Sequence, residues 1–361
     1  MKSGRSLQEL AAELQRRSEN KHDYDVLTRK LRMTDDTNQV LLPNGEQYDV
    51  TRHAHSQVAT KLGIPWKYYD RMRTETPQLL ASNVNHWFEN APPVGKQNKP
   101  EQRLVRTLDG NMRAYLGCGY MALDNWDLAQ VVADELAGMD AVIKSCEVTD
   151  NRLYLQIVTP KIQGEIRKGD VVQSGLIVSN SEIGMGSLMV EPLVYRLVCL
   201  NGLIVNDAAF KRRHITSRME GLGEDGDSIL KDTTKRLIDA GFWATVRDVV
   251  SNAVSETGFD GHLRKFVEST EVKIENDPLD LVERVQSQYQ LTDTEKRGVL
   301  KNLLIEGDMT KFGLVNAVTA VANEDKTDYD RAVELERLGG TILDAPKGIW
   351  EKLDATKEDK K

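Results

Sequence analysis

Residues 175–205 hold two apolar runs separated by a short polar loop, GLIVSNSEIGMGSLMVEPLVYRLVCLNGLIV. The first run is Leu176–Val178 and the second is Leu188–Val205. Short apolar runs bounded by turn signals are typical of buried strands. Gly184 and Gly186 allow the chain to reverse between the runs, because glycine adopts backbone conformations that other residues avoid. The stretch therefore predicts two buried strands joined by a glycine turn, around which we expect the rest of the chain to be organised.

Polar residues interrupt these apolar runs and allow two interpretations. In the first, Arg196 pairs with Glu182 or Glu191, because a charge in a buried strand needs a partner. Asn201-Gly202 is then only a turn or bulge. In the second, the polar residues form one face of a ligand-binding surface that the glycines open to a ligand. This candidate surface consists of Ser179, Asn180, Ser181, Glu182 and Arg196. Spacing does not choose between the two, but the apolar neighbours of Arg196 predict that it is buried and paired.

Composition places the chain among soluble globular proteins. Its 361 residues are enough for two or three packed units, and 40% are hydrophobic and 29% charged. No apolar run approaches the roughly 20 residues that a membrane span needs. The first residues, MKSGRSLQELAAELQRR, contain no apolar signal core. We therefore expect a cytoplasmic protein that does not enter the membrane.

Motifs of known catalytic or metal chemistry are missing from the sequence. Cys118, Cys146 and Cys199 lack paired spacing, so neither a disulfide framework nor a zinc site is indicated. His53 and His55 are two residues apart on a predicted helix and therefore face apart. The sequence has no P-loop, nucleophile elbow or HExxH, and the glycines of the central loop lack the third glycine of a dinucleotide loop. Enzymatic function is not supported, and we expect no cofactor and no metal.

The N-terminal region combines helical and hairpin signals. Residues 6–18 predict an amphipathic helix with Ser6 as its N-cap, a candidate arm or oligomer contact. Further along, Ile64–Tyr69 interleaves aromatic and basic residues and is followed by Arg71 and Arg73. Such a stretch can stack bases while contacting phosphates. The alternative is a short helix whose aromatic residues fill the core and whose charges face water.

Basic residues gather in two further places. Strand-like segments flank Asp109-Gly110, a strong hairpin signal. A basic hairpin can hold a phosphate backbone, and a basic cluster beside a glycine-rich loop can contact polyanions. Each can equally be a solvated surface. The candidate nucleic-acid-binding residues are Arg103, Arg106 and Arg113 on the hairpin, and Lys211, Arg212 and Arg213 after the central strands.

The order of these elements predicts an α+β fold with a largely antiparallel sheet core, N-terminal helices and an all-helical C-terminal third. Helices are predicted at about 278–289, 293–305, 311–323 and 327–337, the last ending at Gly339-Gly340. We divide the chain into an N-terminal helical and hairpin region (1–95), an α+β core (96–220), a helical region (221–345) and a disordered tail (346–361).

Three segments together resemble a known family: SNSEIGMGSL, YRLVCLNGLIV and the preceding RTLDGNMRAYLGCGYMALDN. They resemble the phage/plasmid-like protein family, the domain of unknown function 932. The C-terminal TKFGLVNAVTAVANEDKTDYDRAVELERLGGTIL is similar to the later part of longer members. The resemblance implies a phage, prophage or plasmid origin and a bacterial host cell. It implies no settled activity and no catalytic residues.

Charge and resemblance together lead to a functional expectation. The net charge is -8, with a balance of +4 over residues 1–120, -3 over 121–220 and -9 over the remainder. A mildly basic first third can orient the molecule toward a polyanion. We expect a nucleic-acid-associated protein that binds single-stranded DNA in recombination or replication, with a homo-oligomer as its candidate assembly. The alternative is a non-enzymatic protein-interaction or structural module of a mobile element, for example in evasion of host defence, which the acidic C-terminal third favours.

Overall fold

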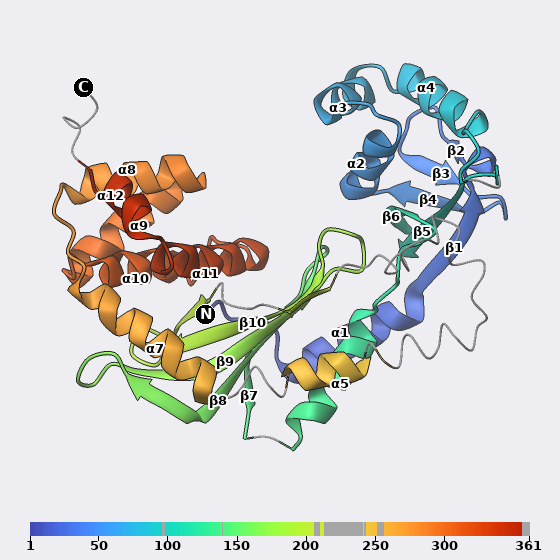
Figure 1. Ribbon diagram of the computed structural model, residues 1–361. Helices are drawn as coiled ribbons and strands as arrows, with labels where there is room; N and C mark the ends of the chain where they lie inside the picture. Colours follow the sequence, from blue (N-terminus) through green and yellow to red (C-terminus); the bar gives the residue numbers. More distant parts are fainter. Residues whose placement is uncertain are drawn as a thin grey trace.

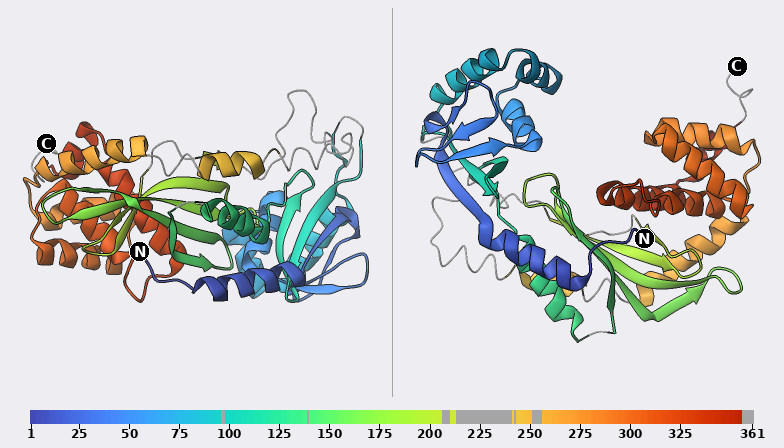
Figure 2. Two further views of the ribbon diagram at one scale, coloured as in Figure 1. Left: turned by 90° about the horizontal axis from the view of Figure 1, so that it is seen from below. Right: turned by 180° about the vertical axis from the view of Figure 1, so that it is seen from behind.

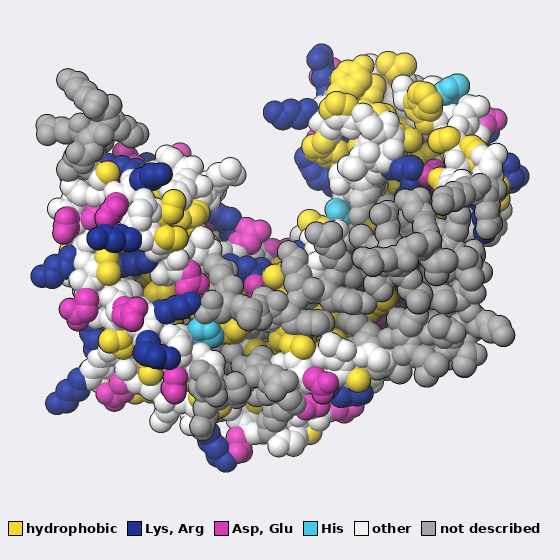
Figure 3. All heavy atoms as spheres, viewed as in Figure 1, with side chains coloured by type: hydrophobic (Ala, Val, Ile, Leu, Met, Phe, Trp, Pro, Cys, Tyr) yellow, Lys and Arg dark blue, Asp and Glu magenta, His cyan; other side chains and the backbone are white. Residues whose placement is uncertain are grey.

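The computed structural model of the chain describes residues 1–95, 98–138, 140–205, 210–212, 241, 243–250 and 256–355. The molecule is C-shaped, with an N-terminal lobe and a C-terminal helical lobe at opposite ends of a central sheet (Figure 1, Figure 2). The space-filling view shows a broad hollow between the two lobes (Figure 3). Among the described helices, none combines the length and apolar composition needed to cross a membrane.

The N-terminal lobe is built on a mixed sheet in which only β4 and β6 pair in parallel. The hairpin predicted at Asp109-Gly110 is present, and both residues have positive φ (50° and 78°), as a type I′ turn requires. The predicted division after residue 95 separates strands that this one sheet joins. In spatial order the strands are β1 (Lys21–Leu27), β5 (Gln102–Leu108), β6 (Asn111–Gly117), β4 (Gln47–Val50), β3 (Gln39–Leu41) and β2 (Arg32–Met33).

Helices cover one face of this sheet: α2 (Arg52–Lys61), α3 (Trp66–Glu75) and α4 (Pro77–Glu89), with the short η1 (Thr28–Lys30) beside them. Tyr69 of α3 is fully buried, and its hydroxyl lies 3.0 Å from Nδ1 of His55. Tyr68, the preceding residue, is exposed. The aromatic stretch predicted from the sequence therefore divides between a core residue and a surface residue.

The central sheet contains the two predicted buried strands, β9 and β10, and all its neighbouring strands are antiparallel. The second apolar run does not form one strand, because it turns at Leu197–Leu200, where Leu200 has a positive φ of 54°. Asn201-Gly202 was predicted as a turn or bulge but begins the next strand. The strands are β11 (Asn201–Ile204), β10 (Leu188–Arg196), β9 (Val171–Asn180), β8 (Leu153–Glu165) and β7 (Val142–Val148), with β12 (Phe210–Arg212) beside β10.

Both faces of the central sheet are covered, which explains the continuous apolar composition of its strands. Leu176 and Val178 of β9 pack with α1 (Leu7–Asn20) and α5 (Asn125–Leu136). Ile177 points to the other face, where it packs with residues of α11. Ser6 caps α1 in a capping box with Glu9, and the apolar side of α1 packs within the chain rather than projecting as an arm.

The C-terminal third is helical in its described residues, as predicted. Gly339-Gly340, predicted as a helix end, lies inside α11, because the absence of side chains lets the helix approach β11. A Cβ on Gly340 would lie 2.0 Å from the carbonyl oxygen of Ile204. Trp350 and Leu353 are buried, so the tail predicted to be disordered contains a helix. The helices are α7 (Glu256–Glu271), α8 (Pro278–Tyr289), α9 (Asp293–Glu306), α10 (Lys311–Val321), α11 (Tyr329–Leu343) and α12 (Lys347–Leu353).

The glycine turn between β9 and β10 presses against the N-terminal lobe. Gly184 has a positive φ of 78°, and a Cβ there would lie 2.8 Å from Cδ2 of Leu116. The predicted special conformation is therefore confirmed for Gly184. Gly186 does not have a positive φ, although a Cβ there would meet the flexible end of Arg152.

Replacing Gly184 by valine is expected to lower the free energy of unfolding by about 2 kcal/mol, because valine is strained at positive φ and meets Leu116. Thermal or urea denaturation measures this. Gly45→Val is the matched control for the backbone, since Gly45 has a positive φ of 91° but open space around it. Gly119→Val controls for valine itself, because Gly119 does not have a positive φ and a Cβ added there would meet no atom within 4 Å. Equal stability of Gly184→Val and Gly119→Val would contradict the prediction.

Candidate functional site

The candidate ligand loop, Ser179–Glu182, is buried where the central sheet meets the N-terminal lobe. Asn180 illustrates how its polar groups are used. Its Nδ2 donates to the carbonyl oxygen of Leu123 and to Oδ1 of Asn125, both at 2.8 Å. The described contacts of the loop thus favour the interpretation in which its polar residues have structural partners.

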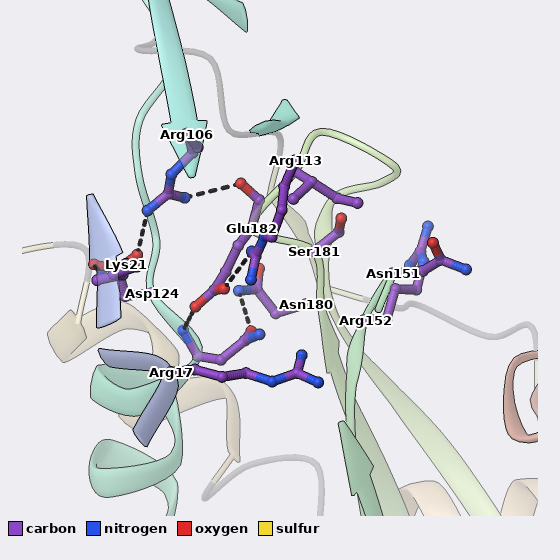
Figure 4. Close-up of polar contacts among 12 residues, drawn as sticks. Arg17, Lys21, Arg106, Arg113, Asp124, Asn151, Arg152, Asn180, Ser181 and Glu182 are labelled. Carbon is purple, nitrogen blue, oxygen red and sulfur yellow. Dashed lines mark hydrogen bonds and ion pairs between the residues drawn. The ribbon is translucent and has the colours of Figure 1, made fainter. Parts of the chain in front are cut away.

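Glu182 is the centre of this junction (Figure 4). Its Oε2 accepts from Nη2 of Arg113 at 2.9 Å, and its Oε1 accepts from the backbone N–H of Asn125 at 2.8 Å. Asn125 begins α5, and the positive end of a helix favours a carboxylate there. The carbonyl oxygen of Glu182 accepts from Nη1 of Arg106 at 2.8 Å. Glu182 therefore joins the central sheet to α5 and to the N-terminal sheet.

Arg106 does not lie on an open basic surface, as the hairpin pattern suggested. Its side chain is only 3% exposed and contacts two carboxylates. Nε and Nη2 lie 2.8 and 3.0 Å from Asp23, and Nη2 lies 2.7 Å from Asp124. Burial acts to raise the pKa of Asp124, but the charges of Arg106 and Lys21 outweigh burial and lower it. Because Arg106 is buried among its own partners, the phosphate contact expected there is corrected to a structural ion pair.

Arg103 also has partners within the chain. Its Nη2 lies 2.7 Å from Oε1 of Glu101, and its guanidinium lies 5.5 Å from the ring centre of Tyr115. The structure thus separates Arg103 from Arg106 and Arg113, although all three come from one hairpin.

Arg196 is largely buried and ion-paired, as predicted, but its partner is neither Glu182 nor Glu191. Its Nε lies 2.6 Å from Oδ1 of Asp170, and its guanidinium lies 5.1 Å from the ring centre of Phe312. It ends β10, whereas the candidate loop precedes the start of that strand. The structure does not bring Arg196 together with the loop.

The structure describes only part of the second basic cluster, Lys211, Arg212 and Arg213. The backbone of Lys211 and Arg212 belongs to β12, which pairs with Met189 and Leu188 at the start of β10. Arg213 lies outside the described residues. The backbone of this cluster thus runs beside the first residues of β10, close in sequence to the candidate loop.

A pocket of about 440 Å³ lies where the N-terminal lobe, α1 and the central sheet meet, and we call it the junction pocket. Its wall combines the end of α1, the start of α2, the β5–β6 hairpin and two turns of the central sheet. Of the three hairpin arginines predicted to bind nucleic acid, Arg113 is the one that lines it. The lining residues are Arg16, Arg17, Thr51, Arg52, His53, Leu108, Asp109, Asn111, Arg113, Asp150, Asn151 and Ile183.

Among the residues that the structure describes, four arginines and two aspartates line the junction pocket. Hydrogen bonds to groups of the central sheet fix the side chains of Arg17 and Arg113. Nη1 of Arg17 donates to the carbonyl oxygen of Thr149 at 2.7 Å, and Nη2 of Arg113 donates to Oε2 of Glu182 at 2.9 Å. Arg16 and Arg52 are more open, with side chains 44% and 70% exposed. Arg16 contacts Glu13 and Asp109, whereas Arg52 lies over the ring of Trp66 and has a longer, 3.4 Å contact with Asp70. The open pair therefore supplies the charge that a ligand meets first.

The N-terminus of α2 adds backbone donors to this wall. Thr51 is its N-cap, and Oγ1 accepts from the N–H of Ala54 at 3.2 Å. The N–H groups of Arg52 and His53 begin the helix and have no acceptor within it. Helix N-termini attract anions for this reason. The arrangement can therefore bind an anionic group between guanidinium and backbone donors.

His53 lines the wall of the junction pocket, and its ring contacts the backbone of the turn between β9 and β10. Burial lowers the pKa of His53, so its ring is neutral at neutral pH. Its Nε2 lies 2.9 Å from the carbonyl oxygen of Ile183, which also accepts from Nε2 of Gln57 at 2.8 Å. These bonds hold the central loop against the pocket. In the described ranges, no group of three or more His, Cys, Asp or Glu side chains is placed to hold a metal ion.

The sequence did not single out most of the pocket. Arg16 and Arg17 are neighbours in α1, but Arg52 of α2, Asn111 of β6 and Asn151 in the turn after β7 are far from them in the sequence, and no spacing connects these segments. The only local signals were the basic end of the first helix and the N-cap at Thr51.

Comparison with known proteins gives one match. The family described as Domain of unknown function (DUF932) matches residues 120–345. This range contains α5, the central sheet and the helices through α11, while most of the N-terminal lobe precedes it. No curated protein and no solved structure matches the chain.

Proposed function

The chain belongs to the DUF932 family, and we propose that it binds single-stranded nucleic acid with the sugar-phosphate backbone in the junction pocket. One observation supports the proposal above all: four arginines and the N-terminus of α2 converge on one pocket. Guanidinium groups and helix N-termini both bind phosphate oxygens. The pocket's volume of about 440 Å³ lies in the range of small-ligand sites, so it can accept one nucleotide unit.

A flexible strand suits this pocket better than a duplex. Five separate segments enclose it, so a bound backbone must bend inward between them. A single strand can do so, whereas smooth bending of a duplex over a short distance costs several kcal/mol, on the order of 1–6. The positive charge balance of the first third of the chain, +4 over residues 1–120, also favours binding at this end of the molecule.

The proposed setting follows from the resemblance stated above. We place the binding activity in the cytoplasm of a bacterial host, in recombination or replication of a phage or plasmid. Several copies along one strand would then act together, which is common among proteins that bind single strands.

The test is a comparison of two double variants by fluorescence anisotropy with a labelled oligothymidylate. Arg16→Gln/Arg52→Gln removes the open arginines of the pocket. Arg32→Gln/Arg167→Gln is the matched control, because it changes the net charge equally and its side chains are similarly exposed, at 53% and 45%. We expect the pocket variant to weaken binding about 10-fold or more, since each charged hydrogen bond contributes about 1.5–3 kcal/mol.

The salt dependence adds a second readout. Removal of two phosphate contacts is expected to reduce the slope of log affinity against log salt by about 1.4, because each contact to a single strand contributes about 0.7. The control variant is expected to keep the wild-type slope. Equal weakening in both double variants would show a general charge effect and contradict a role for the pocket.

A protein-interaction module is the second candidate, and exposed apolar residues favour it. Leu304 and Ile305 of α9 are exposed, as are Val198 and Leu200 in the turn between β10 and β11. Burial raises the pKa of Cys199 in that turn, and the carboxylate of Glu306 adds to the shift. The turn and the end of α9 are therefore close. Absence of nucleic-acid binding in the wild type, together with self-association that Ile305→Asp abolishes in analytical ultracentrifugation, would favour this candidate over the pocket.

A further inference from the structure

We infer that an exposed face of α3, formed by Lys67, Tyr68 and Arg71, stacks bases of the same strand whose backbone enters the junction pocket. We call this face the α3 platform. The inference rests on the proposed function and adds to it the chemical group that is recognised, the base. It also names a surface outside the pocket.

The packing of α3 against the core determines which of its residues form the α3 platform. Tyr69 and Met72 point into the core, and Trp66 stacks on Tyr69 with ring centres 5.9 Å apart. Residues at positions i, i+1 and i+4 share one side of a helix, so Lys67, Tyr68 and Arg71 are neighbours on the outer side. The helix is thereby anchored by its inner aromatics while it presents another aromatic ring to water.

The exposed ring is flanked by positive charge. Tyr68 is 56% exposed, although tyrosine usually hides most of its ring. Lys67 is exposed and has no hydrogen-bond or ion-pair partner in the part of the chain that the structure describes. Arg71 lies three positions after Tyr68, about one helical turn along α3, and its Nε contacts Glu75 at 2.8 Å. An aromatic ring beside cations is the chemistry that binds single strands, because the ring stacks on a base and the cations contact phosphates.

The α3 platform is continuous with the pocket through Arg52. Arg52 lines the junction pocket, and its guanidinium lies 5.1 Å from the ring centre of Trp66, the first residue of α3. Figure 3 shows Lys and Arg side chains projecting from the edge of the N-terminal lobe beside the hollow, where Figure 1 places α3. A strand that leaves the pocket along Arg52 therefore arrives at α3.

Trp87 of α4 provides a matched comparison within the same lobe. Its side chain is 50% exposed, close to the value for Tyr68. However, α4 contains no Lys or Arg, and the ring contacts His86 edge-on with centres 5.3 Å apart. An exposed aromatic without neighbouring cations is a poor site for a charged strand, so Trp87 serves as the control position.

The experiment compares two ligands of equal length, an oligothymidylate of about 16 nucleotides and an abasic strand that has the same backbone without bases. Anisotropy titrations use the full chain as wild type, Tyr68→Leu, Tyr68→Phe, Trp87→Leu and Arg16→Gln/Arg52→Gln. We expect Tyr68→Leu to weaken binding of oligothymidylate about 5-fold or more and to leave the abasic strand unaffected. Tyr68→Phe keeps the ring and is expected to bind as wild type, as is Trp87→Leu.

The outcomes separate the two proposals. If Tyr68→Leu binds both strands as wild type while the pocket variant is weakened, the α3 platform is refuted and the pocket stands. If Trp87→Leu weakens oligothymidylate as much as Tyr68→Leu, the assignment to α3 is also refuted. If the wild type binds neither strand, both the proposed function and the inference fail. Base stacking on α3 is supported if Tyr68→Leu prefers oligothymidylate over the abasic strand less than the wild type does, while the slope of log affinity against log salt is unchanged.

Discussion

Replacement of Arg106 by methionine is expected to lower the free energy of unfolding by about 3 kcal/mol. The variant keeps the apolar part of the side chain but removes the cation paired with Asp23 and leaves Asp124 paired with Lys21. It also removes the donor to the carbonyl oxygen of Glu182. Urea denaturation at neutral pH measures the loss. Arg32→Met is the control, and its exposed, 3.6 Å pair with Glu89 is expected to contribute less than about 1 kcal/mol.

The pH dependence of the stability of Arg106→Met tests whether the loss comes from the ion pair. The pKa of Asp124 is lowered in the folded protein, so its stabilising contribution is present at neutral pH and is lost as the pH falls through the folded pKa. The difference in stability between wild type and Arg106→Met should therefore shrink in acid. A difference that does not change with pH would show that packing, and not the ion pair, explains the loss.

Glu336→Gln is expected to stabilise the protein above about pH 7 by on the order of 3 kcal/mol. Glu336 of α11 is 1% exposed, and burial raises its pKa to about 7, although the amino group of Met1 and the charge of Arg337 oppose this. Oε2 accepts from Nε2 of Gln156 at 2.5 Å, whereas Oε1 has no hydrogen-bond donor. Ionisation therefore places a poorly compensated charge in the core.

The sign of the effect follows from linkage. The pKa of Glu336 in the folded state is above its ordinary value of 4.5, so the stability of the wild type falls as the pH rises from about 4.5 to about 7. Glutamine does not ionise, so the variant should be close to wild type near pH 5 and more stable near pH 8. Glu334→Gln on the same helix is the control, because Glu334 is exposed. Thermal denaturation at both pH values measures the difference, and a variant less stable than wild type near pH 8 would contradict the account.

Local signals in the sequence predicted much of the fold. Asp109-Gly110 specified a hairpin because both residues accept positive φ, and Gly184 marked the turn between β9 and β10 for the same reason. The α+β class and the antiparallel pairing followed from strands joined by short turns. The predicted ranges of four C-terminal helices lie close to those of α8, α9, α10 and α11.

Such local signals could not predict contacts between segments that are distant in the sequence. A run of basic residues on a hairpin does not reveal that Arg106 meets Asp23 and Asp124 in the interior. Gly340 resembles a helix stop until its closeness to Ile204 of β11 is known. The junction pocket depends on residues from α1, α2 and the central sheet, whose meeting is a property of the tertiary structure.

The observed positions of the hairpin arginines change the roles that we assign to them. The hairpin arginines were expected to act together on phosphates, but only Arg113 lines the junction pocket. Arg106 contributes to the same site indirectly, because it binds the carbonyl oxygen of Glu182, which in turn holds Arg113. Substitution of Arg106 is therefore expected to change stability first, and binding only as a consequence.

The most direct test of the central proposal is the affinity of the full-length wild-type chain for a labelled oligothymidylate at about 50 and about 200 mM salt. We predict saturable binding at the lower concentration, with a slope of log affinity against log salt of about -2 or steeper, because about three phosphates or more displace their counterions. Absence of binding at about 50 mM salt, or binding that does not weaken at about 200 mM, would contradict a nucleic-acid role for the junction pocket.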